Sequence, residues 1–167
     1  MNSKKWVIFD LDGTLADIEE RRKFSEKENG KMDWDKFFDP ENIKMDKPNK
    51  PVIMMFQALK EFGYKIAIFS GRSESTLNTT EDWLNDNDIF PNILQLRPES
   101  PKYKWMPDEK LKLHWFNEFI QDLWKKGNYL NTDNSEEVVA VFDDRDKVVK
   151  MWREIGLTCM QVAPGDF

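Results

Sequence analysis

Two apolar segments of the chain each end in a pair of aspartates, and this repeated pattern constrains the fold more than any other feature. The segments are residues 6–9 and 137–142, and the aspartates that follow them are Asp10, Asp12, Asp143 and Asp144. A continuously apolar run is typical of a parallel strand that is covered on both faces. Parallel strands end at one edge of a sheet, so the four carboxylates would meet there and form a cage for a hard cation such as Mg²⁺. Taken alone, the first pair fits an ordinary Asp–Gly turn equally well; the second pair favours the cage.

Helical patterns alternate with the strand patterns along the chain. The expected strands are residues 6–9, 65–69, 93–96, 137–142 and 158–162. The expected helices run from Pro51 to Gly63 with Asn49 as a possible cap, over 74–87, over 107–126 with Gly127 at the end, and around Val148, Val149, Trp152 and Ile155 to Gly156. This order predicts an α/β fold, a doubly wound and mostly parallel Rossmann-like sheet, in one domain of residues 1–167. Residues 1–16 and 48–167 would form the core, and the charged, weakly periodic stretch from about 17 to 47 a short cap-like insert.

Two further stretches have the chemistry of anion binding. Ser70, Gly71 and Arg72 follow the second expected strand, where free backbone N–H groups, a hydroxyl and a guanidinium could hold a phosphate. A plain glycine turn with a surface arginine is the alternative. In the helix over 107–126, Asp108 and Lys112 continue the apolar stripe inward, although a simple i, i+4 ion pair is also consistent with their spacing.

Composition and missing motifs exclude several classes of function. A net charge of −6 and a pI of about 5.0 argue against a protein that wraps long nucleic acid. Cys159 is the only cysteine, which excludes an internal disulfide and a zinc cysteine cluster, and it is expected in the core. No apolar run is long enough to span a bilayer, the first residues lack the apolar core of a signal peptide, and a reducing cytoplasm is the expected compartment. Neither a dinucleotide-binding glycine motif nor a P-loop is present, so a dinucleotide-binding fold and a P-loop kinase are disfavoured.

The chemical motifs, taken in order, resemble those of a known superfamily. Residues 9–15, 69–72, 112 and 142–145 look like the four motifs of the haloacid dehalogenase-like phosphohydrolases. The match is closer still for residues 142–156 and 161–167, which resemble the end of the 3′-phosphatase domain of bacteriophage polynucleotide kinase–phosphatase. Residues 96–98 and 107–112 also look like that group, whereas residues 17–47 and 73–92 show only weak similarity.

The resemblance implies a role for each of these residues. Asp10 would be the nucleophile that forms an aspartyl-phosphate, and Asp12 the general acid and then the base. Mg²⁺ would be bound by Asp10, the backbone carbonyl of Asp12 and Asp143, with Asp144 in or beside this ligand shell. Lys112, held in place by Asp108, would neutralise the nucleophile and the phosphate. Substrate contacts are expected from Gly13, Thr14, Ser70, Gly71, Arg72, Arg97 and one of Arg21 and Arg22, between which the sequence does not decide.

The function that these roles imply is that of a Mg²⁺-dependent phosphatase. Its expected substrate is the 3′-phosphate of a DNA or RNA end or of a nucleotide, because a short insert would leave the site open to a large substrate. A nucleotidase or small-ester phosphatase with the same mechanism is the alternative, and the acidic pI keeps it open. A non-catalytic phosphate-binding module is disfavoured, since binding alone needs no nucleophile. No membrane and no obligate protein partner are expected, and if the protein is phage-encoded it would act in the host cytoplasm.

Overall fold

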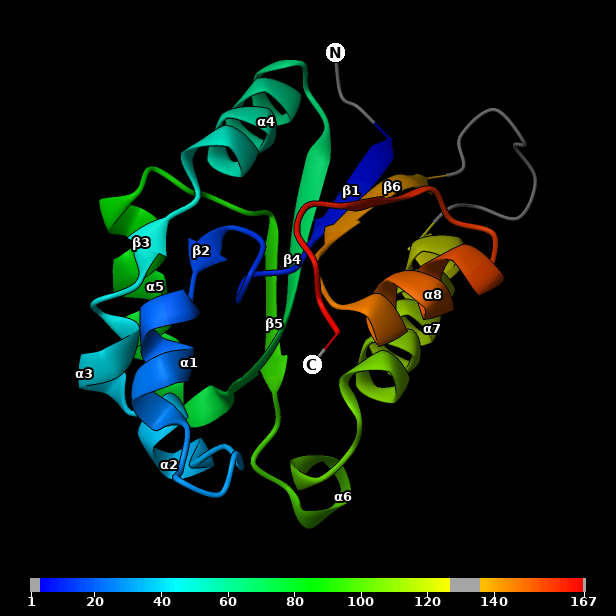
Figure 1. The fold of residues 1–167 in the computed structure, drawn as a ribbon. Helices are drawn as coiled ribbons and strands as arrows, with labels where there is room; N and C mark the ends of the chain where they lie inside the picture. The colour runs from blue at the N-terminus through cyan, green and yellow to red at the C-terminus, as the bar shows by residue number, and fades with distance from the viewer. Residues whose placement is uncertain (1–3, 127–135, 167) are drawn as a thin grey trace.

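The fold is built on one parallel sheet. The computed structural model describes residues 4–126 and 136–166. In that part of the chain, five parallel strands form a sheet in the order β5-β4-β1-β6-β7 (Figure 1). They are β1 (Lys5–Phe9), β4 (Lys65–Ser73), β5 (Ile93–Arg97), β6 (Glu137–Asp143) and β7 (Cys159–Gln161). The predicted doubly wound α/β fold is confirmed, and β4 and β6 extend beyond the apolar runs into the polar residues that follow them.

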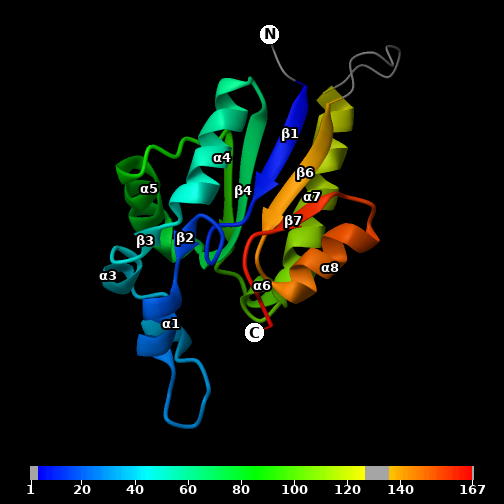
Figure 2. The same ribbon diagram turned by 45° about the horizontal axis from the view of Figure 1, so that its top comes forward.

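Helices cover both faces of the sheet, as Figure 2 shows, with α4 and α5 on one side and α7 and α8 on the other. They are α4 (Lys50–Glu61), α5 (Leu77–Asp86), α7 (Asp108–Lys126) and α8 (Asp146–Glu154), with the short α6 (Pro101–Lys104) and a 3-10 turn at Glu74–Thr76 between them. Successive side chains of β1 point to opposite faces of the sheet and so belong to two separate parts of the core. Val7 and Phe9 pack with the side chains of α4 and α5, whereas Trp6 and Ile8 pack with those of α7 and α8. This two-sided burial explains why β1 is apolar without alternation.

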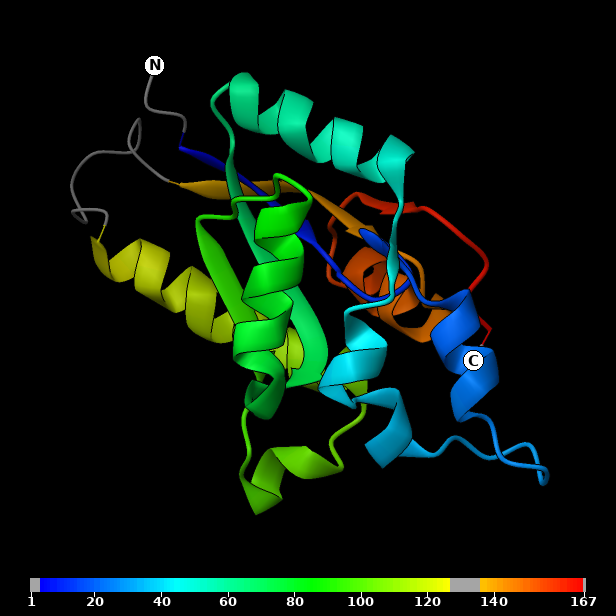
Figure 3. The same ribbon diagram turned by 90° about the vertical axis from the view of Figure 1, so that its left-hand side faces the viewer.

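The insert is a small layer beyond the carboxyl end of β1 (Figures 1 and 3). It consists of α1 (Glu19–Ser25), α2 (Trp34–Phe37) and α3 (Pro40–Ile43), between the short antiparallel strands β2 (Ala16–Asp17) and β3 (Lys47–Pro48). Phe37 and Ile43 are buried, and Phe37 packs against the rings of Trp34 and Phe38. Ile18 and Phe37 belong to the same hydrophobic cluster as Val7 and Phe9 of β1, and these apolar contacts attach the insert to the core, which the charged sequence of the stretch does not reveal.

Local details differ from the sequence interpretation in two places. Asn49 precedes α4, but its side chain donates to the carbonyl of Thr14 at 2.9 Å and makes no capping bond. Ile155, predicted to point inward, is 40% exposed because α8 ends one residue before it. Gly127 lies outside the described residues. Cys159 is buried in the core, as predicted. None of the described helices combines the length and the apolar character that crossing a membrane requires.

Candidate active site

Three aspartates meet at the carboxyl edge of the sheet because β1 and β6 are paired in register. Phe9 lies opposite Phe142, so the next residues, Asp10 and Asp143, come side by side. The backbone N–H of Asp10 donates to the carbonyl of Phe142 at 2.9 Å. Asp144 follows in the loop after β6, and one carboxylate oxygen from each of the three lies within 4.8 Å of the others. All three are buried, so their mutual repulsion is weakly screened unless a cation is present.

Lys112 supplies a positive charge from helix α7. Its ammonium group donates to Asp10 Oδ1 at 2.6 Å and to Asp143 Oδ2 at 2.8 Å, and the residue is 3% exposed. Burial alone would lower the pKa of Lys112, but Asp10 and Asp143 raise it above its ordinary value, so the ammonium stays charged. The alternative of a simple surface pair with Asp108 is therefore wrong, since the partners of Lys112 are the acids of the sheet edge.

Lys112 does not fully neutralise the three acids. Burial, followed by the charges of Asp143 and Asp144, raises the pKa of Asp10 well above its ordinary value despite Lys112. Burial and the neighbouring Asp143 raise the pKa of Asp144 to about 7. Within the described residues, Asp10 Oδ2 is buried without a hydrogen-bond partner. An oxygen cluster of this kind fits a divalent cation, which would supply the missing partner and the missing charge.

Gly13 shapes the other side of this cluster. Its φ of +88° is a conformation that glycine adopts more readily than other residues, and a Cβ built there would lie 2.0 Å from Asp144 Oδ2. Thr14, in the same turn, has a buried hydroxyl without a partner among the described residues. The turn after β1 therefore lies directly against the acidic cluster, where the sequence placed it.

Asp12 faces two arginines instead of the three acids. Arg21 Nη2 and Arg72 Nη2 each lie 2.5 Å from Asp12 Oδ1, and Arg72 Nε donates to the same oxygen at 2.9 Å. Burial works against the charged form, but Arg72 and Arg21 outweigh it and lower the pKa of Asp12 to about 2. In this arrangement Asp12 is a carboxylate. A role as general acid would require at least one of these contacts to change when substrate binds.

The choice between the two candidate arginines of α1 falls on Arg21. It is buried, stacks over the ring of Phe37 at 4.2 Å, and donates to the carbonyl of Phe37 at 2.9 Å. Arg22, in contrast, is only half-buried.

Asp46 completes this group and was missed by the sequence analysis. Its carboxylate accepts from Arg21 Nε at 2.9 Å and from Arg72 Nη2 at 3.0 Å, and its side chain is 1% exposed. Burial, more than any charge, raises the pKa of Asp46 to about 6. Trp83 Nε1 donates to the Asp46 carbonyl at 2.9 Å and joins the insert to α5. Asp46 lies in a stretch without periodicity or a recognisable motif, so no local signal distinguished it from the other insert acids.

The remaining predicted residues include Ser70, Asp108 and Arg97. Ser70 is buried in β4, and its Oγ accepts from the Arg72 N–H at 3.3 Å. Asp108, expected to hold Lys112, instead pairs with Arg97 and Arg145.

Arg97 also donates to three backbone carbonyls, those of Gly71 at 3.2 Å, Met106 at 2.8 Å and Tyr103. A Cβ on Gly71 would come within 2.9 Å of Asp108 Oδ1. Arg97 thus ties β4 to the start of α7, the helix that carries Lys112.

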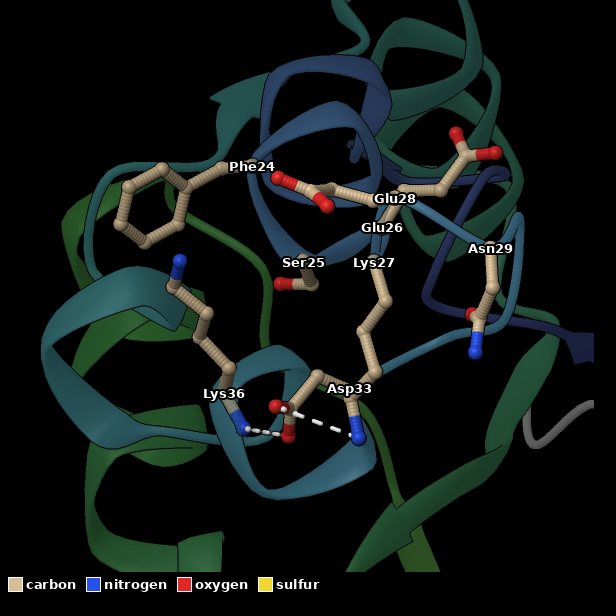
Figure 4. A pocket seen from close by; sticks show the side chains of 8 residues that line it. All are labelled: Phe24, Ser25, Glu26, Lys27, Glu28, Asn29, Asp33 and Lys36. Carbon is tan, nitrogen blue, oxygen red and sulfur yellow. Dashed lines mark hydrogen bonds and ion pairs between the residues drawn. The ribbon is translucent and has the colours of Figure 1, made fainter.

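A cavity of about 530 Å³ lies in the insert, away from the acids (Figure 4). It is lined by Phe24, Ser25, Glu26, Lys27, Glu28, Asn29, Asp33 and Lys36. Three of these side chains are acidic and two are basic, and the Lys36 ammonium lies 3.7 Å from the centroid of the Phe24 ring. None of the acids and none of their cationic partners lines this cavity. The candidate active site is therefore assigned from the charged side chains at the edge of the sheet and not from the cavity.

Comparisons with known proteins agree with the geometry. The family model for the phosphatase domain of polynucleotide kinase PNKP matches residues 4–167. A protein of Autographa californica nuclear polyhedrosis virus, provisionally named a bifunctional polynucleotide kinase/RNA ligase, is 32% identical over 151 residues, which are 89% of this chain and 18% of the viral protein. A chain of the solved Pnkp1/Rnl/Hen1 RNA repair complex is 30% identical with a TM-score of 0.70, covering 98% of this chain and 43% of that chain.

More distant structures share the fold alone. A haloacid dehalogenase-like hydrolase from Streptococcus pneumoniae aligns with a TM-score of 0.56 at 15% identity, over 93% of this chain and 83% of that chain. The chain thus spans less than half the length of the viral relative and of the repair-complex chain, and the shared part is the phosphatase domain. The chain belongs to the family of polynucleotide kinase phosphatase domains, within the haloacid dehalogenase-like hydrolases.

Proposed function

We propose that the protein is a Mg²⁺-dependent phosphomonoesterase that removes the 3′-phosphate from nucleic-acid ends or nucleotides through an aspartyl-phosphate. The observation that carries this proposal is the buried cluster of Asp10, Asp143 and Asp144 with Lys112 beside it. A cluster with a nucleophile, a fixed ammonium group and room for a cation suits phosphoryl transfer, which depends on positioning and charge stabilisation. Family membership supports the phosphatase chemistry.

The metal would be held by Asp10, Asp143 and Asp144, and the unpartnered Asp10 Oδ2 supports this choice. The backbone carbonyl of Asp12 is the fourth proposed ligand. When bound, Mg²⁺ would neutralise the acids and the oxygens of the substrate phosphate. Water molecules would complete the coordination of the metal, because hard cations of this kind also keep water ligands.

The side chains divide the reaction between them. In the first step an Asp10 oxygen attacks phosphorus, the bond from phosphorus to the 3′ oxygen breaks, and Asp12 gives that oxygen its proton. In the second step water attacks phosphorus, Asp12 takes the water proton, and inorganic phosphate leaves Asp10. Lys112 stabilises the charge that develops on the transferring group, and Ser70 with the N–H groups near Gly71 would orient its oxygens.

Asp12 needs a proton for the first step, and the arginines control whether it has one. Their contacts hold the pKa of Asp12 at about 2, which leaves it deprotonated at neutral pH. A substrate phosphate would compete for Arg72 and Arg21 and weaken these contacts. The pKa of Asp12 would then rise, because burial opposes its charge.

The 3′ end of a polynucleotide is the favoured substrate for two reasons. The insert places short helices beside the site, and it offers less cover than a full cap domain would. The family is also named for a polynucleotide kinase, and the related chain belongs to an RNA repair complex. A nucleotidase of the same mechanism is the second candidate, favoured by the net charge of −6, which weakens attraction to a long polyanion.

A substrate panel tests the proposal. Phosphate release would be measured for a 3′-phosphorylated oligonucleotide, its 5′-phosphorylated twin and the matching mononucleotides, each with Mg²⁺ or EDTA. We expect release from the 3′-phosphorylated strand that is lost in EDTA. Release from mononucleotides alone would favour the nucleotidase, and equal release with EDTA would contradict the role of the metal.

Asp46→Asn should lower kcat/KM for phosphate release by about 10²-fold with little change in the urea midpoint. An amide oxygen can hold one arginine but not both, and small displacements of positioned groups have effects of this size. Burial outweighs the arginines in the pKa of Asp46, so its charge adds little net stability. Asp35→Asn, an exposed acid of the same insert, is the control and should match the wild type. Unchanged kcat/KM in Asp46→Asn would show that the arginines do not need this carboxylate.

A further inference from the structure

The end of β6 and the loop after it carry two of the three clustered acids, Asp143 and Asp144, and a distant segment of the chain lies against them. Residues 161–166 begin with the last residue of β7 and pass beside the end of β6 and the start of α8 (Figures 1 and 2). Val162 N–H donates to the carbonyl of Asp143 at 3.1 Å, and Asp146 N–H donates to the carbonyl of Gly165 at 2.8 Å. We call residues 161–166 the strap.

Gln161 adds a side-chain contact to these backbone bonds. Its Nε2 donates to the carbonyl of Asp144 at 2.9 Å and to Asp146 Oδ1 at 2.6 Å. The strap therefore contacts the backbone on both sides of Asp144, at Asp143 and at Asp146. Of the two neighbouring acids, Asp143 is the last residue of β6 and Asp144 lies beyond the strand.

Gly165 allows the strap to lie this close. It is buried, and a Cβ built there would lie 2.1 Å from the carbonyl oxygen of Asp144 and 2.6 Å from Cα of Arg145. Both are backbone atoms, so no flexible side chain could move aside. On the opposite side of Asp144, a Cβ on Gly13 would lie 2.0 Å from its carboxylate. Asp144 is thus enclosed between two glycines from opposite parts of the chain.

We propose that the strap sets the position of Asp144 for metal binding, and that Gly165 and Gln161 are positioning residues that act through it. This inference rests on the metal site of the proposed function and not on the identity of the substrate. A methyl group at Gly165 would displace either the strap or the Asp144–Arg145 backbone. Displacement of the loop would move one of the three carboxylates away from the other two, and a divalent ion would lose a ligand.

The test is Mn²⁺ binding to the substrate-free protein, measured by electron paramagnetic resonance of the free ion. We expect Gly165→Ala to raise the Kd for Mn²⁺ by about 10-fold or more, and Gln161→Ala by a smaller factor, in line with the loss of outer contacts of metal ligands. The fall in phosphatase activity at low Mg²⁺ should be partly restored at high Mg²⁺, which a merely unfolded fraction would not show.

Gly156→Ala is the matched control. Like Gly165→Ala, it adds one methyl group near α8. Apart from its chain neighbours, however, no heavy atom of the described residues lies within 4 Å of the added Cβ. Its φ of +92° means that the substitution strains the backbone, so the melting temperature should fall while the Kd for Mn²⁺ stays at the wild-type value.

The outcomes separate the strap from the rest of the proposal. Wild-type Mn²⁺ affinity in folded Gly165→Ala would overturn the inference, and so would equal weakening in Gly156→Ala. If Gly165→Ala does not fold, Gln161→Ala decides in the same way. Mn²⁺ binding by the wild type without release of a 3′-phosphate would refute the proposed substrate and leave the strap supported by its own measurement. A wild-type protein without Mn²⁺ affinity would overturn the metal site and this inference together.

Discussion

Asp10→Asn should lower the rate of phosphate release by more than about 10⁴-fold, because the nucleophile is removed. A carboxamide carries no negative charge and cannot form the acyl-phosphate that splits the reaction into two steps. The fold should survive the change. The asparagine oxygen can still accept from Lys112, and the loss of one charge relieves repulsion with Asp143 and Asp144, which raise the pKa of Asp10 in the wild type.

The measurement combines activity with stability. Release of phosphate from the 3′-phosphorylated oligonucleotide would be followed for the variant and the wild type, alongside urea denaturation without metal. We expect the variant to be inactive and at least as stable as the wild type at pH 7, where the wild-type acids are crowded. Asp86→Asn, on the exposed end of α5, is the control and should leave both quantities unchanged. Substantial turnover by the Asp10 variant would refute the aspartyl-phosphate mechanism.

The strands and the acids could be predicted because each is a local feature of the sequence. Uninterrupted apolar runs ending in aspartates identify β1 and β6, and one edge of a parallel sheet is where their ends must lie. The register that pairs Phe9 with Phe142 depends on packing between distant segments, and no local pattern records it. The sequence therefore indicated that Asp10, Asp143 and Asp144 gather, but it wrongly placed the Asp12 side chain with them, since that carboxylate faces Arg21 and Arg72.

The contacts of the charged residues beyond the strands could not be predicted for the same reason. Asp46 is an ordinary acid of the insert until the fold brings Arg21 and Arg72 to it. Asp108 has the helical spacing for a pair with Lys112, yet the sheet edge offers Lys112 two buried carboxylates and offers Asp108 two arginines. For Asp108 and Lys112, tertiary neighbours override a local spacing that is worth only a few tenths of a kcal/mol.

Lys112→Met should destabilise the metal-free protein by about 3–5 kcal/mol, because it leaves buried carboxylates without their cation. Methionine has a similar length and fills the space, so the loss reports on charge more than on packing. The loss should be smaller at low pH. Without Lys112 the pKa of Asp10 would rise further above that of the unfolded chain, and an acid with a raised pKa in the fold favours the folded state at low pH and disfavours it as the pH rises through that pKa.

Metal should restore much of this stability. A divalent ion bound by Asp10, Asp143 and Asp144 neutralises the same carboxylates, so Mg²⁺ should stabilise Lys112→Met more than it stabilises the wild type. Urea denaturation at pH 5 and pH 8, with Mg²⁺ or EDTA, measures both effects, and Lys110→Met, exposed on the same helix, is the control. Activity should stay low even in Mg²⁺, because the ion cannot replace the ammonium group on the transferring phosphate. A stability loss that is independent of both pH and Mg²⁺ would mean that Lys112 acts through packing, and that the acids at the sheet edge do not share one electrostatic site.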